Sequence, residues 1–386
     1  MSMIRDPRLA AALTDEELAW LKFICPVTEH YGRAVRALDL QGLTLACWQH
    51  VLPDTVLSLM PFVEAGARVR LGACSPDSTD DRVAAWLAKN GVEVFAKSGM
   101  TDAEYRANLA EMASGPVDII CDMGGELIEA IANEGHTVLG ALEATTTGVH
   151  RIKDRALPFP TFNWNDIVLK DALHNRYHVG DTVWPVFSAL TNMSLYGRSI
   201  LIIGFGPVGR GMAERARAIG GVVSVVERDP VRRLEAQHFG CRPVTLEDGL
   251  ASNSIIVTAT GIPGILTGEK LSLVRDGAIL VNVGHGNREI DVNWLERHPK
   301  TVMKRHVERF DISGKRLYLL NRGSLLNLAA GSGRYGSDCF DPYNAVMLSG
   351  LSWIGQGGAA SHEPGFHPFP RELELEIAEL TAQSRG

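Results

Sequence analysis

The sequence predicts an α/β protein with two doubly wound parallel sheets. Three observations support this fold class. Apolar strand patterns alternate with helical patterns in two separate series, a glycine-rich turn opens the second series, and the last fifty residues return to helical patterns of the first kind. Alternation of this type favours parallel sheets that are covered by helices on both faces.

The first series runs from residue 43 to residue 125. Apolar runs predict strands at 43–50, 67–74, 92–97 and 117–125, and apolar residues at helical spacing predict helices at 55–66, 80–91 and 102–113. The carboxyl ends of these strands carry His50, Cys74 and Asp122. Open α/β sheets bind ligands at this edge, so these side chains are candidates for a binding site.

The second series predicts strands near 199–203, 221–227, 241–246, 254–259 and 277–283. The segment 162–197 between the two series is largely helical and resembles a hinge. After about residue 330, a helix at 344–356, a turn region rich in Pro, His and Gly at 361–370, and an acidic amphipathic helix follow. We expect a substrate domain at 1–182, a dinucleotide-binding domain at 183–332, and a return to the substrate domain at 333–386.

A dinucleotide site is predicted at Gly204-x-Gly206-x-x-Gly209, which follows the apolar run SILII and opens a helical pattern. Glycines at this spacing allow a tight turn and a close approach of the backbone to a pyrophosphate. The next strand ends at Glu227, whose carboxylate suits the ribose diol of NAD and repels the 2′-phosphate of NADP. Arg228 follows directly and leaves some room for NADP. The alternative is a glycine-rich turn followed by an acidic surface residue.

Composition excludes several classes of function. Of the 386 residues, 45% are hydrophobic and 22% charged, and the net charge of −7 argues against a nucleic-acid partner. Lys and Arg are scattered, no apolar run reaches the length of a membrane span, and the N-terminus does not resemble a signal peptide. The six cysteines stand apart without C-x-x-C, which indicates reduced thiols in a cytoplasmic protein and no metal site.

Several motifs occur in a specific order: EATTTGVHRIK (143–153), NWNDIVLKDALHNRYH (163–178), the glycine-rich segment, VTATGIPGIL (257–266), NVGHGNREIDVNWL (282–295) and LLNLAAG (325–331). Together they resemble the S-adenosylhomocysteine hydrolase family over nearly the whole chain. The resemblance implies a Rossmann NAD domain inserted into a split substrate domain, a nucleoside substrate, and a homodimer or homotetramer. It also implies NAD that is tightly bound and recycled.

The family reaction oxidises C3′ of a ribonucleoside, which makes the C4′ proton acidic, and then expels the 5′ substituent before water adds. The resemblance implies that Lys170 assists removal of the 3′-hydroxyl proton, and that His50, Asp122 and His285 lie around C5′. It implies a purine contact at Asp54. The implied cofactor contacts are Thr145, Thr146, Thr147, Asn175, Gly204, Gly206, Pro207, Val208, Gly209, Glu227, Arg228, Thr258, Thr260, Gly284, His285 and Asn327. From the residues alone, the threonine run is equally a turn that caps a helix.

The chain departs from the family pattern at four places. Ala144 replaces a second acid that grips the sugar hydroxyls, and the lost hydrogen bond is worth roughly 1.5–3 kcal/mol. His174 replaces an aspartate near Lys170, which tends to lower the lysine pKa and gives the relay a group that titrates near neutral pH. Arg334 stands about where a purine-pocket histidine is expected. The family's C-terminal lysine and tyrosine have no counterpart, which leaves the usual cofactor clamp and oligomer in doubt.

Four functions are open at this point. The favoured one is a diverged nucleoside enzyme that loses water from C5′ to form an exo-glycal, as in nucleoside-antibiotic pathways of the angustmycin type. There the sugar carries an additional hydroxymethyl group, which the Ala144 position would accommodate. The second is a genuine S-adenosylhomocysteine hydrolase, which would release homocysteine. A plain NAD-dependent dehydrogenase would accumulate NADH, and an inactive NAD- or nucleoside-binding regulator would tolerate loss of Lys170.

Overall fold

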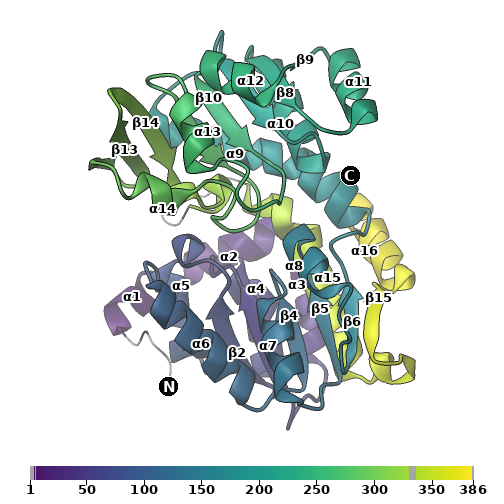
Figure 1. Cartoon of the computed structure of the whole chain (residues 1–386). Coiled ribbons are helices and arrows are strands. Elements are labelled where there is room, and N and C mark those ends of the chain that lie inside the picture. The colour runs from purple at the N-terminus through teal and green to yellow at the C-terminus, as the bar shows by residue number, and fades with distance from the viewer. Residues whose placement is uncertain (1–3, 5, 330–335, 385–386) are drawn as a thin grey trace. The chain divides into compact units, whose positions relative to one another are not determined.

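The computed structural model describes residues 4, 6–329 and 336–384 (Figure 1). The chain forms two compact units, residues 1–170 with 337–386, and residues 171–336. The change between them falls at Lys170 and Asp171, whereas the sequence placed it after residue 182. A π-helix, Leu169–His178, runs directly into α9 (Val179–Thr191), so no turn signal marks the change.

Unit 1 contains a seven-stranded sheet in which all neighbouring strands are parallel. The order is β15-β6-β5-β4-β1-β2-β3, with β1 Thr44–Gln49, β2 Arg68–Ala73, β3 Glu93–Phe95, β4 Ile119–Asp122, β5 Gly140–Glu143, β6 Pro160–Asn163 and β15 Gly365–Pro368. Strand β15 lies within the segment 361–370, which the sequence predicted as a turn. It is an edge strand, where proline and glycine are tolerated because one side needs no ladder bonds.

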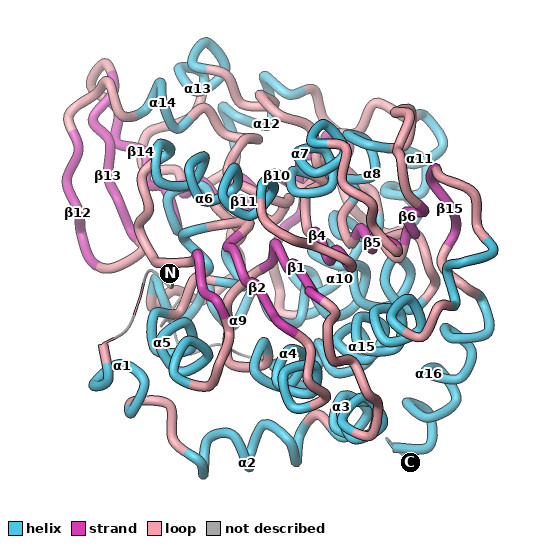
Figure 2. The backbone as a smooth tube through the Cα atoms, turned by 90° about the horizontal axis from the view of Figure 1, so that it is seen from below, coloured by secondary structure: helices cyan, strands magenta, loops and turns pink. Residues whose placement is uncertain are grey.

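Helices cover both faces of this sheet. They are α1 Pro7–Ala11, α2 Asp15–Ile24, α3 Pro26–Arg36, α4 Thr55–Glu64, α5 Asp81–Lys89, α6 Asp102–Ser114, α7 Glu126–Glu134, α8 Thr146–Ile152, α15 Asp341–Gly355 and α16 Arg371–Ser384. Figure 2 shows α6 and α7 on one side of the central strands and α3, α4 and α15 on the other. Strands β1, β4 and β5 are buried along their whole length, which explains their continuous apolar sequences.

The segment after residue 336 is fastened into unit 1 by a buried carboxylate. The backbone amides of Val27 and Thr28 donate to the Asp341 side chain over 3.1 and 2.6 Å, and the Thr28 hydroxyl donates to the Asp341 carbonyl over 2.9 Å. These bonds pair α15 with the start of α3. Helix α15 therefore brings C-terminal residues next to strands from the first half of the chain.

Unit 2 contains an eight-stranded sheet in the order β12-β13-β14-β11-β10-β7-β8-β9. Its strands are β7 Ser199–Ile203, β8 Val222–Val226, β9 Arg242–Pro243, β10 Ile255–Thr258, β11 Ile279–Asn282, β12 Lys300–Lys304, β13 Val307–Ile312 and β14 Lys315–Leu320. The six strands from β14 to β9 are parallel, and β12, β13 and β14 pair antiparallel. The sheet is thus mixed at one end, which the sequence did not anticipate.

The helices of unit 2 are α9, α10 Pro207–Ala218, α11 Pro230–His238, α12 Leu246–Ser252, α13 Gly268–Leu273 and α14 Val292–Leu295. Short 3₁₀ turns occur in both units, at Pro76–Ser78, Asn321–Gly323, Leu326–Leu328, Ser337–Phe340 and Gly358–Ser361. Among the described helices, none is both long enough and apolar enough to cross a membrane.

Candidate active site and cofactor site

The first group of predicted site residues lies where strands β1, β2 and β4 of unit 1 end. The register pairs Trp48 of β1 with Asp122 of β4, so the residues that follow these strands share one edge. The His50 Nδ1 atom lies 2.6 Å from the Ser78 hydroxyl and 3.5 Å from the Cys74 sulfur. Ser78 was not anticipated from the sequence, because nothing in its local pattern separates it from an ordinary turn serine.

Two members of this group, Cys74 and Asp122, have pKa values that burial raises. Of the two, Asp122 carries a carboxyl, which can act as an acid or a base. Its side chain is fully buried, and its Oδ2 accepts a hydrogen bond from the Ile128 amide over 2.9 Å. Its Oδ1 has no hydrogen-bond partner within the described part of the chain. Burial, together with the negative charge of Glu126, raises the pKa of Asp122 to about 7. The group can therefore donate or accept a proton near neutral pH.

Glu143 ties the threonine segment to the sheet. Its Oε1 accepts hydrogen bonds from the Thr145 amide over 2.7 Å, the Thr145 hydroxyl over 2.8 Å and the Gly124 amide over 3.2 Å. Burial and the nearby Asp122 raise the pKa of Glu143. A Cβ on Gly148 would lie 2.1 Å from the same carboxylate, so only glycine fits at that position.

The threonines therefore have different structural roles. The Thr145 hydroxyl accepts from the Gly148 amide over 2.9 Å and caps α8, as in the alternative interpretation of the sequence. Thr146 is exposed, and its hydroxyl makes long hydrogen bonds with the Asn165 side chain, donating to Oδ1 over 3.5 Å and accepting from Nδ2 over 3.3 Å. Thr145 thus has a structural role as the N-cap of α8, and cofactor contact by Thr145, Thr146 and the half-buried Thr147 stays a prediction.

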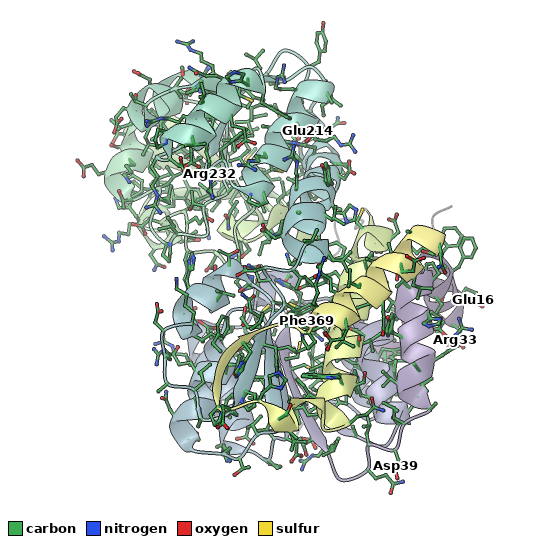
Figure 3. The ribbon with its side chains drawn as sticks, turned by 90° about the vertical axis from the view of Figure 1, so that its right-hand side faces the viewer. Glu16, Arg33, Asp39, Glu214, Arg232 and Phe369 are labelled. Atoms are coloured by element: carbon green, nitrogen blue, oxygen red, sulfur yellow. The ribbon has the colours of Figure 1, made fainter. Side chains whose placement is uncertain are left out.

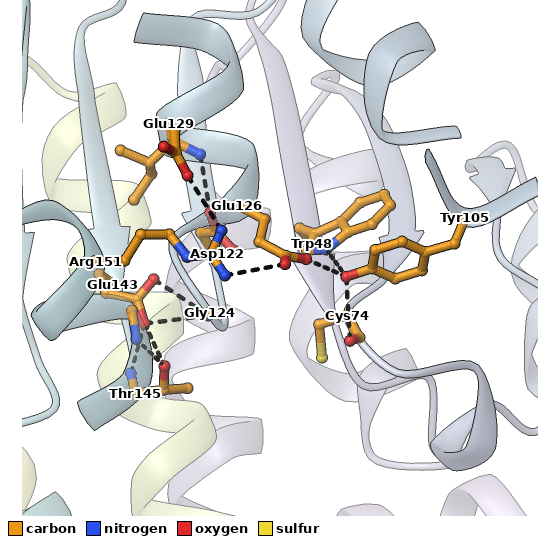
Figure 4. Close-up of polar contacts among 12 residues, drawn as sticks. Trp48, Cys74, Tyr105, Asp122, Gly124, Glu126, Glu129, Glu143, Thr145 and Arg151 are labelled. Atoms are coloured by element: carbon orange, nitrogen blue, oxygen red, sulfur yellow. Dashed lines mark hydrogen bonds and ion pairs between the residues drawn. The ribbon is translucent and has the colours of Figure 1, made fainter. Parts of the chain in front are cut away.

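A polar network that the sequence did not predict lies beside Asp122 (Figure 4). The Tyr105 hydroxyl is bonded to the Glu126 carboxylate, accepts from the Trp48 indole over 3.2 Å and donates to the Cys74 carbonyl over 3.4 Å. Arg151 pairs with Glu126 over 3.1 Å, and also with the carboxylate of Glu129 over 3.1 Å. The network joins α6, α7 and α8 at the edge that carries Asp122.

Lys170 and Asp54 lie against the segment that returns to unit 1. The Lys170 ammonium is 5.2 Å from the centre of the Tyr343 ring, which stacks on Trp164 with 4.6 Å between ring centres. The Asn344 amide donates to Asp54 over 3.0 Å. Ala144 is fully buried and belongs to the hydrophobic core of this unit.

The π-helix Leu169–His178 carries three predicted site residues across the change between units. Lys170 belongs to unit 1, and His174 and Asn175 belong to unit 2. His174 is buried and its ring meets that of His178 edge to face at 5.8 Å between centres. π-helical turns are rare and occur frequently at functional sites. Arg334 lies outside the described residues.

The glycine-rich turn of unit 2 leaves room above one of its three glycines. Gly204 has a φ of +99°, and a Cβ at this position would lie 2.7 Å from the Ala259 carbonyl oxygen. A Cβ on Gly209 would lie 2.0 Å from the Gly204 carbonyl oxygen. A Cβ on Gly206 would meet only the end of an arginine side chain, at 3.9 Å. Gly204 and Gly209 thus pack backbone on backbone, whereas Gly206 faces open space at the start of α10. That cradle fits a dinucleotide pyrophosphate.

Glu227 lies at the end of β8 as predicted. Its two oxygens accept from the Phe205 amide over 2.7 Å and the Asp229 amide over 3.0 Å, so the carboxylate is held beside the glycine-rich turn. A carboxylate in this place has lone pairs left for the ribose hydroxyls of NAD.

The loops after β10 and β11 are braced by a buried acid that the sequence did not single out. Glu289 accepts from the Thr260 amide and hydroxyl over 3.0 and 2.7 Å and from the Gly261 amide over 2.7 Å. Asn282 donates to the carbonyls of Gly284 and Gly286, on either side of His285. Thr260 thus helps to hold the loop next to the one that carries His285.

Two further predicted contacts are buried in unit 2. Thr258 donates to the Asn282 side chain over 2.9 Å, which gives it a supporting place in the fold. The Asn327 amide donates to Thr182 over 3.2 Å, and its Oδ1 has no hydrogen-bond partner among the described residues. That oxygen is free to accept from a carboxamide. The described residues contain no group of three or more His, Cys, Asp or Glu side chains that could hold a metal ion.

Comparison with known proteins agrees with this geometry. Residues 24–138 match the family model of S-adenosyl-L-homocysteine hydrolase, and residues 175–333 match the model of its NAD binding domain. The chain is 34% identical to the S-inosyl-L-homocysteine hydrolase of Methanopyrus kandleri, over 99% of this chain and 93% of that protein. It is 35% identical to the adenosylhomocysteinase of Archaeoglobus fulgidus, over 90% and 88%. The chain belongs to the S-adenosyl-L-homocysteine hydrolase family of NAD-dependent enzymes.

Proposed function

We propose that this enzyme removes the 5′ substituent of a nucleoside through transient oxidation at C3′, and that the substituent is a hydroxyl group that leaves as water. The observation that carries the proposal is the state of Asp122. A fully buried carboxyl with a pKa of about 7, whose Oδ1 has no hydrogen-bond partner among the described residues, is a suitable acid for a poor leaving group. Hydroxide needs protonation to leave far more than a thiolate does.

Each step has a group in the described structure that can perform it. Lys170, held over the Tyr343 ring, removes the 3′-hydroxyl proton. NAD, when bound, accepts the C3′ hydride and returns it at the end of the cycle. Asp122 and His50 transfer protons at C4′ and C5′. Loss of the C4′ proton and the C5′ hydroxyl gives a C4′–C5′ double bond and one water, and the reaction stops before water is added back.

The departures near the sugar support a changed substrate. Ala144 cannot bind the sugar hydroxyls that an acid at this position would bind. Its methyl group is fully buried in the core, so the structure supports a lost contact and not a cavity for an additional hydroxymethyl group. We therefore assign a nucleoside with a free 5′-hydroxyl and leave the substitution of its sugar to the experiment.

Hydrolysis of an S-nucleosyl-homocysteine is the second candidate. It is favoured by the names of the relatives, since proteins 32–35% identical to this chain are called S-inosyl-L-homocysteine hydrolase or adenosylhomocysteinase. In that reaction the same residues would act on a thioether, and water would add to C5′.

One mass-spectrometric experiment separates the two. The purified protein, supplied with NAD in D2O, is incubated in parallel with S-adenosylhomocysteine, S-inosylhomocysteine, adenosine, and an adenine nucleoside whose sugar carries an additional hydroxymethyl group. Loss of one water from a 5′-hydroxyl nucleoside supports dehydration. Release of homocysteine with deuterium in the ribose would establish the hydrolase instead. Asp122→Asn serves as the control, because either reaction should slow in it.

A further inference from the structure

Arg232, labelled in Figure 3, lies at the start of α11. Its side chain borders the open space above Gly206. One of its guanidinium nitrogens is 3.9 Å from the point where a Cβ on Gly206 would stand. Apart from Gly206 itself and the chain next to it, no other heavy atom of the described residues lies within 4 Å of that point. The space that fits a pyrophosphate is therefore bordered by one positive charge. We propose that Arg232 binds a phosphate oxygen of the dinucleotide across this space.

The protein itself makes little use of this charge. Arg232 is about half exposed, and its ion pair with Asp229 is long, with 3.9 Å between Nε and Oδ2. Exposed pairs of this length contribute little to stability. Arg210, another cation near the glycine-rich turn, is engaged instead, because it pairs with Glu235 and lies over the Phe205 ring. Arg232 is thus an arginine near this turn whose charge is available for a ligand.

The position of Arg232 in its helix points the same way. The first turn of α11 contains no acidic residue, and Arg232 and Arg233 both stand in it. The amide end of a helix carries partial positive charge, and here the N-cap carboxylate of Asp229, which accepts from the Val231 and Arg232 amides, is one negative charge against two arginines. A pyrophosphate held at the neighbouring start of α10 would supply further negative charge.

Binding of the cofactor can be measured without any turnover, so this inference is tested independently of the proposed function. Protein freed of nucleotide is titrated by calorimetry with NAD, ADP-ribose and adenosine. Arg232→Ala should weaken NAD and ADP-ribose by about 10- to 100-fold, because a charge-assisted hydrogen bond is lost. Adenosine, which has no phosphate, should bind equally well to both proteins.

Arg233→Ala is the matched control, because it removes the same charge from the same exposed turn. It should change NAD binding less than twofold, and Arg232→Lys should fall between the wild type and Arg232→Ala. An Arg232→Ala protein that binds NAD within twofold of the wild type would overturn the proposal. Equal weakening in Arg233→Ala would overturn it too, since that result indicates a general electrostatic effect and no specific contact of Arg232.

Discussion

Replacing Asp122 by Asn should make the protein more stable above neutral pH while it slows catalysis. Burial raises the pKa of this carboxyl from 3.8 to about 7. The folded chain therefore keeps a proton that the unfolded chain releases. For this reason the contribution of Asp122 to the free energy of unfolding becomes less favourable as the pH rises. Below the unfolded pKa there is no cost, the cost grows between about pH 4 and pH 7, and above pH 7 it levels off.

The two pKa values set the size of this effect. From 3.8 and about 7, ionisation of Asp122 costs the folded state about 2 kcal/mol at pH 5 and about 4 kcal/mol at pH 8.5. An asparagine side chain bears no such cost, and its oxygen can still accept from the Ile128 amide. The stability difference between Asp122→Asn and the wild type should thus grow by about 2–3 kcal/mol between these two pH values.

Urea denaturation at pH 5 and pH 8.5, followed by tryptophan fluorescence, measures this difference. Comparing the two proteins at each pH cancels the titration of all groups that the substitution does not affect. Asp39→Asn is the control, because it removes a carboxylate from an exposed turn. A stability difference that is the same at both pH values, or that shrinks as the pH rises, would show that Asp122 is an ordinary ionised carboxylate and would remove it as the acid.

Three further predictions concern single side chains. Gly209→Ala should destabilise the protein by about 1–3 kcal/mol in thermal unfolding, because its Cβ meets backbone, whereas Gly206→Ala should fold normally and bind NAD less tightly in calorimetry. Lys170→Ala should slow reduction of bound NAD by a nucleoside at least about 100-fold, measured by absorbance of the reduced cofactor. Arg151→Met removes a positive charge that lowers the pKa of Asp122, so the acidic group in the pH–rate profile should titrate at higher pH.

The fold class could be predicted, and so could strands β1 to β4 of the first sheet and β7 to β11 of the second, because buried parallel strands have continuous apolar sequences and helices have their own period. Strands β5 and β6 of the first sheet were missed. Strand β15 could not be predicted, because an edge strand such as GFHP needs neither apolar residues nor a full set of hydrogen bonds. The antiparallel strands β12, β13 and β14 were missed. They lie at one end of the second sheet, and only the central strands of that sheet have continuous apolar sequences. Motifs predicted Asp122 and Lys170, but not the partners that determine their chemistry.

The missed partners have a common physical cause. Tyr105, Glu126 and Arg151 lie on three different helices, and only the packing of those helices brings them together. Arg232 is likewise a candidate phosphate contact only because the fold brings it close to Gly206, which lies 26 residues earlier in the sequence. Sequence spacing reveals contacts within one turn or one strand, whereas contacts between elements require the fold.

The position of the departures argues for a changed substrate and against loss of activity. Glu143 and Ala144 are neighbours in the sequence. Glu143, the acid that is retained, accepts three hydrogen bonds that hold the threonine segment. Ala144, which replaces the second acid of the family, is a small residue buried in the core. A decaying enzyme would lose proton-transfer groups as readily as sugar contacts. Here Lys170, His50 and Asp122, to which we assign the proton transfers, are all kept, and Asp122 is fully buried, which raises its pKa.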